Sequence, residues 1–93
     1  MLLYQDISKV IVNSAYEVHK FLGSGYLEKV YENALIKELE SKNLKCEQQA
    51  PLEVYYKDYM VGDYIADIIV EDKIILEIKA ISGIEDKHFA QLL

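Results

Sequence analysis

Disulfides and zinc sites are excluded by what the sequence lacks. Cys46 is the single cysteine among 93 residues, which also hold two histidines, one proline and no tryptophan. One cysteine cannot form an internal disulfide, so a reducing, cytoplasmic location is expected. One cysteine and two histidines also fall short of the ligand set of a usual structural zinc site.

Positive charge and long apolar runs are scarce as well. The chain has 10 Lys and Arg residues against 16 Asp and Glu residues, a formal net charge of −6. This balance argues against tight non-specific binding of nucleic acid, because such binding needs cations that neutralise phosphates. No apolar run approaches the roughly 20 residues of a membrane helix, and the N-terminus turns polar too early for a signal peptide.

What is present is the composition of a soluble globular protein. Hydrophobic residues make up 52% of the chain and charged residues 28%. We expect one domain, residues 1–93, with a small hydrophobic core. The apolar pattern stops inside an expected helix. We therefore expect a domain that is truncated at its C-terminus, where a homo-oligomer or another partner would complete the helix and the sheet.

The apolar periodicity predicts a chain that begins with two helices. The first is expected over residues 6–22, with Asp6 as its N-cap and Gly23 in a left-handed conformation after it. The second is expected over residues 26–42, with Asn43 as its C-cap. Spacings of three and four predict one buried stripe in each helix. The stripes are Ile7, Val10, Ile11, Ala15, Val18, Phe21 and Leu22 in the first helix, and Leu27, Val30, Tyr31, Ala34, Leu35 and Leu39 in the second.

The second half of the sequence has the pattern of strands. They are expected over residues 44–50, 52–56, 59–70 and 73–80, followed by a helix over residues 84–93. Pro51 predicts an edge strand or a bend, and Gly62 predicts a bulge or a bend. We interpret four clustered tyrosines as core and cross-strand packing rather than as platforms for nucleic-acid bases. They are Tyr55, Tyr56, Tyr59 and Tyr64.

Three charges interrupt the most apolar strands: Asp67, Glu77 and Lys79. Strands that are apolar on both faces are expected to be covered on both, where an uncompensated charge costs several kcal/mol. The two carboxylates therefore need a cation beside them. Mg²⁺ is commonly held by one or two carboxylates, and a nearby lysine can then stabilise charge on a phosphate. A structural salt-bridge network with Lys79 accounts for the same spacing, and the spacing alone leaves both interpretations open.

A shared site depends on the register of the last two strands. A two-residue loop would pair Val70 with Lys73 and turn Asp67 to the wrong face, whereas a three-residue loop over residues 71–73 pairs Val70 with Ile74 and Asp67 with Glu77. In the second register one face consists of Ile65, Asp67, Ile69, Ile75, Glu77 and Lys79. The other face consists of Ala66, Ile68, Val70, Ile74, Leu76 and Ile78.

Several motifs occur in an order that resembles a known family. Gly25, Glu28 and Tyr31 match the pattern G-x-x-E-x-x-Y, followed by Ala34-Leu35, and Gly62, Tyr64-Ile65-Ala66-Asp67 and Leu76-Glu77-Ile78-Lys79 lie downstream. This order resembles the GxxExxY family of the PD-(D/E)XK nuclease-like superfamily. The resemblance implies an α/β (α+β) restriction-endonuclease-like core, with a central mixed sheet flanked by helices and a C-terminal strand beyond the present sequence.

The resemblance also implies roles for individual residues. Asp67, Glu77 and Glu28 would hold Mg²⁺ or Mn²⁺, Lys79 would be the catalytic lysine, and Gln91 would be the polar residue on the helix after the core. Glu28 also lies where a carboxylate favours the start of a helix, and this role is compatible with the site.

Three functions follow as alternatives. The first is a nuclease, dependent on Mg²⁺ or Mn²⁺, that hydrolyses phosphodiester bonds of DNA or RNA. The second is a binding or assembly module that keeps the nuclease fold without turnover, as the acidic charge and the end of the sequence indicate. In the third, the charges form a structural network only.

Overall fold

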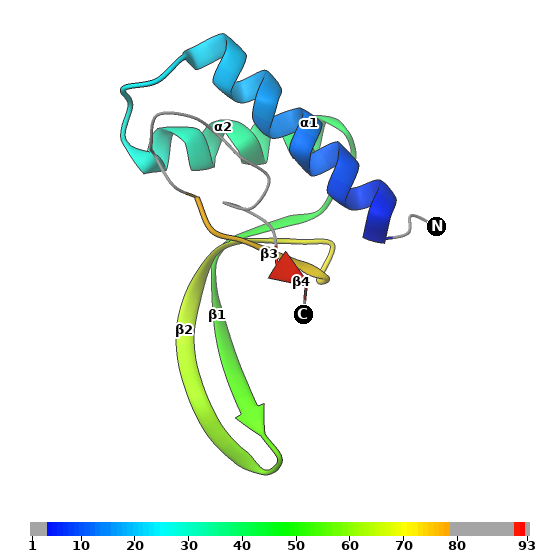
Figure 1. Ribbon diagram of the computed structural model, residues 1–93, viewed down its shortest axis with the longest axis vertical. Helices are drawn as coiled ribbons and strands as arrows, with labels where there is room; N and C mark the ends of the chain where they lie inside the picture. The colour runs from blue at the N-terminus through cyan, green and yellow to red at the C-terminus, as the bar shows by residue number, and fades with distance from the viewer. Residues whose placement is uncertain (1–3, 79–90, 93) are drawn as a thin grey trace.

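The fold consists of two helices followed by an antiparallel sheet. The computed structural model describes residues 4–78 and 91–92. The elements are α1 (Tyr4–Leu22), α2 (Glu28–Ser41), β1 (Cys46–Tyr56), β2 (Tyr59–Val70), β3 (Ile74–Leu76) and β4 (Gln91–Leu92). The strand order β1-β2-β3-β4 follows the sequence (Figure 1). The predicted α+β class is confirmed.

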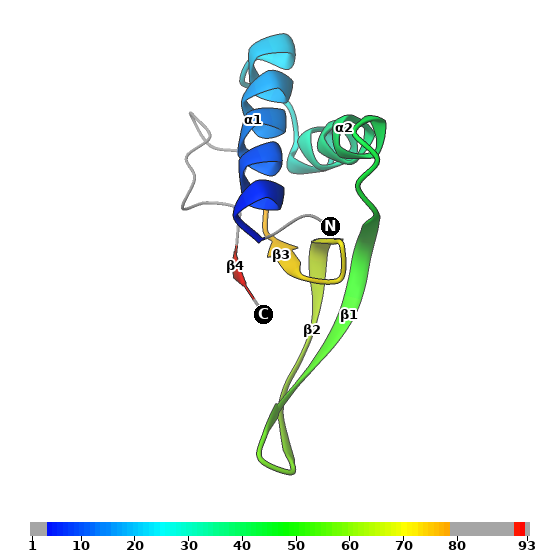
Figure 2. The ribbon, with the colours of Figure 1, turned by 90° about the vertical axis from the view of Figure 1, so that its right-hand side faces the viewer.

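The sheet differs from the predicted mixed one, because the strand pairs in the described ranges are all antiparallel. Both helices lie against the same end of the sheet, and the β1–β2 hairpin projects away from them (Figures 1 and 2). No helix in the described part is long and apolar enough to cross a membrane.

The first helix ends where the sequence predicts. Gly23 has a φ of 73°, a conformation that costs glycine little, and its N–H donates to the carbonyl of His19 at 2.8 Å. The buried side of α1 is formed by Ile7, Ile11, Ala15 and Val18. Phe21, which we expected in that stripe, lies in the last turn and is 87% exposed.

The second helix begins later than predicted, at Glu28 rather than Tyr26. Leu27 is its N-cap and has an extended backbone, so it stands outside the helical periodicity and is 80% exposed. Val30 is exposed too. The buried side of α2 is therefore rotated from the expected stripe and consists of Tyr31, Glu32, Leu35, Ile36 and Leu39.

Tyr31 fixes the loop between the two helices. Its hydroxyl donates to the carbonyl of Gly23 at 2.6 Å and accepts the N–H of Tyr26 at 3.3 Å. The rings of Tyr26 and Tyr31 also meet edge to face, with centroids 6.2 Å apart. The tyrosine of the G-x-x-E-x-x-Y pattern thus holds the chain that enters α2.

The main core lies between the helices and one side of the sheet. It joins the buried side chains of α1 and α2 to Leu44 and to alternate residues of the last strands, Ile68, Val70, Ile74, Leu76 and Ile78. A second, smaller cluster contains Ala50, Ala66, Ile69 and Ile75. The predicted alternation is confirmed for Ile68, Val70, Ile74, Leu76 and Ile78 on one face and for Ile69 and Ile75 on the other. Ala66 is an exception, because it belongs to the second cluster.

The start of β1 is tied to the turn between β2 and β3. The N–H of Lys45 donates to a carboxylate oxygen of Glu71 at 2.6 Å, and the N–H of Glu71 donates to the carbonyl of Lys45 at 2.9 Å. An ion pair between Lys45 and Asp72, at 3.0 Å, lies beside these bonds. Contacts between residues far apart in the sequence therefore close the open end of the long hairpin.

The β1–β2 hairpin is continuous where two strand pieces were predicted. Pro51 lies within β1, opposite Ile65, and β1 is an edge strand, as the missing N–H of proline favours. The register shifts between Val54, which pairs with Gly62, and Tyr55, which pairs with Met60, so Val61 is the extra residue of a bulge. The predicted bulge is confirmed beside Gly62.

The tyrosines of this hairpin are not core residues. Tyr55, Tyr56, Tyr59 and Tyr64 are 57%, 61%, 71% and 40% exposed. The prediction that they pack in the core is wrong, because α1 and α2 cover only the other end of the two strands (Figure 2).

The last described residues form a strand where a helix was predicted. Gln91 pairs with Ile75 and Leu92 with Ile74, so β4 extends the sheet beside β3. The rest of the predicted helix, residues 84–90, lies outside the described residues, as do residues 79–80 of the predicted fourth strand.

Candidate active site

The candidate site lies where the β1–β2 ladder is interrupted. Gln48 pairs with Ile68 and Ala50 with Ala66, but Gln49, which stands between them, makes no ladder pair with Asp67. Gln49 has a φ of 51°, a conformation uncommon outside glycine. The irregular backbone frees Gln49 and Asp67 from the regular alternation of the sheet.

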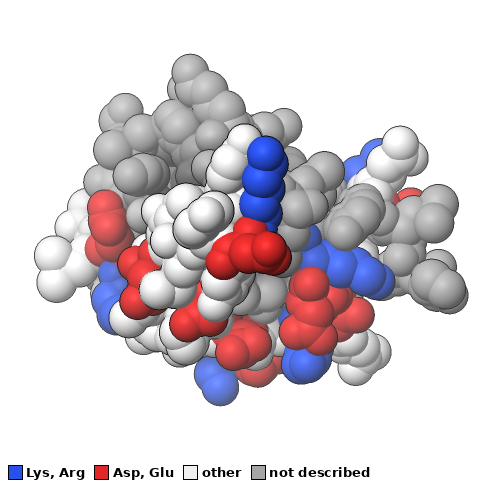
Figure 3. All heavy atoms as spheres, turned by 90° about the horizontal axis from the view of Figure 1, so that it is seen from below, with Lys and Arg blue, Asp and Glu red and all other residues white. Residues whose placement is uncertain are grey.

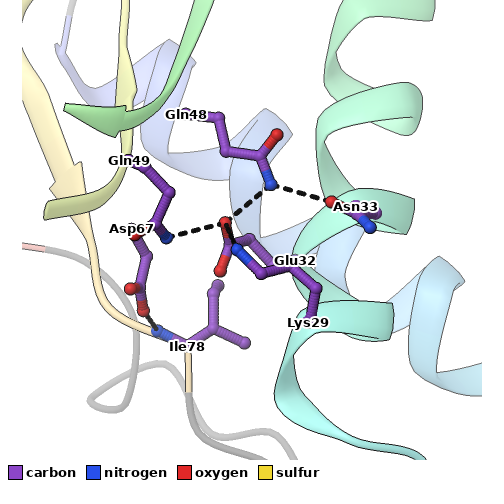
Figure 4. Close-up of polar contacts among 7 residues, drawn as sticks. All are labelled: Lys29, Glu32, Asn33, Gln48, Gln49, Asp67 and Ile78. Atoms are coloured by element: carbon purple, nitrogen blue, oxygen red, sulfur yellow. Dashed lines mark hydrogen bonds and ion pairs between the residues drawn. The ribbon is translucent and has the colours of Figure 1, made fainter.

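Asp67 bonds to the segment that follows β3. One oxygen of its carboxylate, Oδ2, accepts the backbone N–H of Ile78 at 2.8 Å (Figure 4). The side chain of Asp67 is half-buried. This bond holds the segment around Ile78, which lies between Glu77 and Lys79 in the sequence, against the middle of β2.

The turn between β2 and β3 has the three residues that a shared site requires. Val70 pairs with Ile74, and the register continues through Ile69 with Ile75 and Ile68 with Leu76. Glu71 and Asp72 both have positive φ values, 54° and 56°. The ladder ends at the pair of Ile68 with Leu76, one step before Asp67 and Glu77.

Glu32 is a functional candidate that the sequence analysis missed. Its side chain projects from α2 and is only 4% exposed as a residue. Its Oε2 atom accepts hydrogen bonds from the side-chain amides of Gln48 at 2.7 Å and Gln49 at 3.0 Å, and from Lys29 Nζ at 3.2 Å (Figure 4). The amide of Gln48 also donates to Asn33 at 2.7 Å. These bonds connect α2 to the interrupted part of β1, directly across from Asp67.

The hydrogen bonds keep Glu32 ionised despite its burial. Burial by itself raises the pKa of this carboxyl, but the bonds from Gln48, Gln49 and Lys29, with the charge of Lys29, outweigh it and hold the pKa below its usual range. Glu32 is therefore a buried anion at neutral pH. All three donors meet Oε2, so these bonds leave Oε1 unused.

A signal for Glu32 was present in the sequence. Leu35, Ile36 and Leu39 follow it at three, four and seven residues, so the helical periodicity places it within the apolar side of α2. A charged residue at such a position needs partners, which marks it as a candidate for a site. The partners themselves were not predictable, because they depend on the irregular backbone at Gln49.

The predicted site residues are placed as follows. Glu28 is the first residue of α2, exposed, one turn before Glu32. Glu77 is half-buried and follows β3 directly. Lys79 lies outside the described residues, and Gln91 belongs to β4 rather than to a helix. The structure thus brings Asp67 next to the chain at Glu77. Glu32 of α2 bonds to Gln48 and Gln49 of β1.

The donor atoms in this region suit a hard cation. Asp67, Glu77 and Glu32 offer carboxylate oxygens, which Mg²⁺ and Mn²⁺ prefer. Among residues 4–78, no group of three or more acidic, histidine or cysteine side chains is close enough to hold a metal ion. Sites for Mg²⁺ commonly use one or two carboxylates together with water and substrate, and Asp67 and Glu77 are residues of that chemical type.

The α+β fold described above is consistent with a nuclease-like core. The model of the PD-(D/E)XK nuclease superfamily matches residues 5–93. The chain belongs to this superfamily, whose nucleases act on nucleic acid and commonly use divalent metal ions. No significant match was found among curated proteins or among solved structures.

Proposed function

We propose that the protein is a nuclease, dependent on Mg²⁺ or Mn²⁺, that hydrolyses phosphodiester bonds of DNA or RNA. Within the superfamily, the pattern of Gly25, Glu28 and Tyr31 favours the GxxExxY family. The observation that carries the proposal is the hydrogen bond from Ile78 to Asp67, because it joins one acidic residue of the motif to the segment that holds the other two motif residues.

The roles follow from the chemistry of each side chain. Asp67 and Glu77 would hold the cation. Glu28 or Glu32 would be a further acidic residue beside it. When bound, the cation would polarise a phosphate oxygen and make water easier to deprotonate. Lys79 would stabilise the additional negative charge of the transition state or orient the attacking water.

The charge of the protein makes a cation necessary for this function. The net charge is −6, and the candidate site itself is acidic, so phosphate is repelled from it. A divalent cation between the carboxylates and the substrate removes this repulsion. We therefore expect both binding and cleavage to require the metal.

The first experiment measures cleavage of plasmid DNA, single-stranded DNA and single-stranded RNA with Mg²⁺, with Mn²⁺ and with a chelator. Cleavage is expected only with metal, and Asp67→Asn should reduce it by about 100-fold or more. Asparagine is chosen because its carbonyl can still accept the N–H of Ile78. The variant therefore removes a charge while it keeps the local fold.

Matched controls lie close to each position in the sequence. Asp63→Asn changes an exposed carboxylate on the same strand as Asp67, and Lys73→Met changes a lysine in the β2–β3 turn as the counterpart of Lys79→Met. Both controls should keep activity. Equal loss in the control and the site variants, or cleavage that survives Asp67→Asn and Lys79→Met, would disprove the assigned site.

A second measurement detects metal binding without a substrate. A metal at a hundred times its dissociation constant stabilises the folded state by about 2.7 kcal/mol. Thermal unfolding should therefore shift upward by several degrees with Mg²⁺ or Mn²⁺ in the wild type and in Asp63→Asn, but not in Asp67→Asn. No shift in the wild type would favour the structural network of charges.

A further inference from the structure

Two neighbouring residues of β1 direct their side chains to the same atom. The amides of Gln48 and Gln49 both donate to Oε2 of Glu32, at 2.7 and 3.0 Å (Figure 4). Successive side chains of a regular strand point to opposite faces, so only one of the two amides could reach α2 from an extended β1. The φ of 51° at Gln49 accounts for their convergence. Glu32 therefore binds β1 at the point where β1 departs from the strand conformation.

The conformation of Gln49 is maintained by a contact rather than by packing. A non-glycine residue adopts a positive φ at an energetic cost, so surrounding contacts must maintain it. Gln49 is exposed, which leaves little packing around it. Its amide, however, is bonded to the carboxylate of a residue that is only 4% exposed. The buried side chain of Glu32 is thus the fixed end of this contact, and Gln49 is the end that it holds.

Stability alone does not require a carboxylate at position 32. The buried side of α2 also contains Leu35, Ile36 and Leu39, and an apolar residue would pack among them. Replacing a buried, paired charge by an apolar side chain of similar volume is often neutral or stabilising. Residues in a strained conformation, such as Gln49, cluster at functional sites. The contact between Glu32 and Gln49 is therefore better explained by what lies opposite Gln49.

The residue opposite Gln49 is Asp67, and the strand changes side there. Ile68 belongs to the main core and Ala66 to the second cluster, although alternate residues of a regular strand share a face. An extended Gln49 would restore the ladder pair with Asp67 and the regular alternation. The carboxylate of Asp67 would then turn from its present direction and lose the N–H of Ile78, which it accepts at 2.8 Å.

We propose that Glu32 is a positioning residue that acts on Asp67 through Gln49. The carboxylate of Glu32 holds the amide of Gln49, and the resulting backbone conformation keeps the ladder open opposite Asp67. The carboxylate of Asp67 then stays directed at the segment around Ile78. In this role Glu32 does not touch the metal ion. The importance of this role for catalysis rests on the proposed function, in which Asp67 holds the cation, whereas its effect on the conformation of Asp67 does not.

Glu32→Leu separates this role from a structural one. Leucine keeps the volume but cannot accept the amide of Gln49, and the former donors are exposed residues that can turn to water. The variant should therefore remain folded, as circular dichroism checks, while Asp67 is released. Gln49→Ala removes the other end of the contact and is the second variant. Glu38→Leu is the matched control, because that carboxylate of the same helix pairs with Lys42 at the surface.

The first test measures hydrogen exchange of the Ile78 N–H by NMR in the metal-free protein. Glu32→Leu and Gln49→Ala should each speed this exchange by about tenfold or more, because the acceptor on Asp67 is no longer held in place. The N–H of Lys73, which donates to the carbonyl of Val70 at 3.0 Å, is the internal reference, since a general loss of stability would speed both. Equal acceleration of the two N–H groups, or none at Ile78, overturns the proposal.

The second test measures the dissociation constant for Mn²⁺ by titration calorimetry. Loss of a residue that orients a metal ligand typically weakens metal binding by about 10–100-fold, and we expect this range for Glu32→Leu and for Gln49→Ala. Glu38→Leu should stay within about twofold of the wild type. The double variant should bind no more than about twofold more weakly than the weaker single variant, because both residues act through one contact. Effects that multiply would indicate direct contact of Glu32 with the metal, and they overturn the proposal.

The acidic surface determines which binding event is compared. Acidic side chains are spread over the molecule as seen from the hairpin end (Figure 3), so weak Mn²⁺ binding outside the site is expected. The constant compared is therefore that of the binding lost in Asp67→Asn. If the wild type shows neither this binding nor cleavage, the proposed nuclease function fails, and the exchange at Ile78 still decides the role of Glu32. If the wild type and both variants bind Mn²⁺ equally well, the role of Glu32 fails and the nuclease proposal stands.

Discussion

The two ends of the β1–β2 hairpin carry the same apolar pattern, but the residues of one end are buried and those of the other end are exposed to solvent. In β2, Ile68 is 0% exposed and Val70 is 0% exposed, whereas Ile65 and Val61 are 59% and 61% exposed. These residues have the same chemistry and lie on one continuous strand. What separates them is the position of α1 and α2, which cover only the far end of the hairpin. Strand periodicity therefore predicts which residues share a face, but not whether that face is covered.

The candidate site lies at the border between these two regions. Asp67 and Gln49 stand at the ladder interruption, between the covered and the projecting parts of the strands. Polar side chains can be half-buried there without entering the core, and their backbone is free of the ladder. The border thus provides both the shielding and the irregular geometry that a catalytic site requires.

The largest predicted effect contrasts two isoleucines of β2. Ile68→Ala removes a fully buried side chain from the main core and should lower the free energy of unfolding by about 2–5 kcal/mol. Ile65→Ala, three residues earlier and 59% exposed, should change it by no more than about 0.5 kcal/mol. Urea unfolding at low protein concentration measures both. Similar losses would mean that the hairpin and the helix-covered end form a single core.

An intermediate effect on the free energy of unfolding is expected for Glu32, whose partners lie at the ladder interruption. Glu32→Gln leaves the donors of Gln48, Gln49 and Lys29 without their anion, so it should lower the free energy of unfolding at neutral pH by about 1–3 kcal/mol. The control is Glu38→Gln on the same helix. Glu38 pairs with Lys42 at the surface, where such a pair contributes about 0–1 kcal/mol.

The pH dependence of this difference has a definite sign. The folded pKa of Glu32 lies below the unfolded one, so its contribution is present above the unfolded value of about 4.3 and is lost as pH falls through the folded pKa. The gap between the wild type and Glu32→Gln should therefore shrink as the pH decreases below about 4. A gap that stays constant down to pH 3 would contradict an ionised Glu32.

The smallest effect on stability is expected for Tyr31, which holds the loop between α1 and α2. Tyr31→Phe keeps the ring against Tyr26 but removes the hydroxyl that bonds Gly23 and Tyr26, at a cost of about 0.5–1.5 kcal/mol. Tyr59→Phe in the exposed hairpin is the control, and it should leave the melting temperature unchanged. Thermal unfolding distinguishes the two, with a decrease of a few degrees for Tyr31→Phe alone.

Much of the fold was predictable because it depends on local signals. The end of α1 at Gly23, the edge position of Pro51 and the bulge beside Gly62 follow from the backbone preferences of single residues. The start of α2 was predicted too early, because Leu27 continues the apolar spacing although its backbone is extended. The sheet at Gln91 was predicted as a helix, because pairing with β3 depends on residues distant in the sequence.

The candidate site was predictable only in part. Asp67 and Glu77 stand out as charges among apolar residues, and the register that brings them together needs the three-residue turn that the structure has. The partners of Glu32 come from α2 and β1. They depend on the positive φ of Gln49, which no sequence pattern predicts. The roles of Glu28, Lys79 and Gln91 remain predictions.

The paired bonds between Lys45 and Glu71 have a consequence for how the protein folds. A long hairpin can begin at its tip within microseconds, and a slip of two residues keeps every side chain on its own face. Such a slipped hairpin would still satisfy the apolar pattern, so hydrophobic burial alone would not reject it. It would, however, separate Lys45 from Glu71 and lose both hydrogen bonds between these residues at the open end. This contact therefore favours the correct register over the slipped one, and the same register sets the position of Gln49 and Asp67.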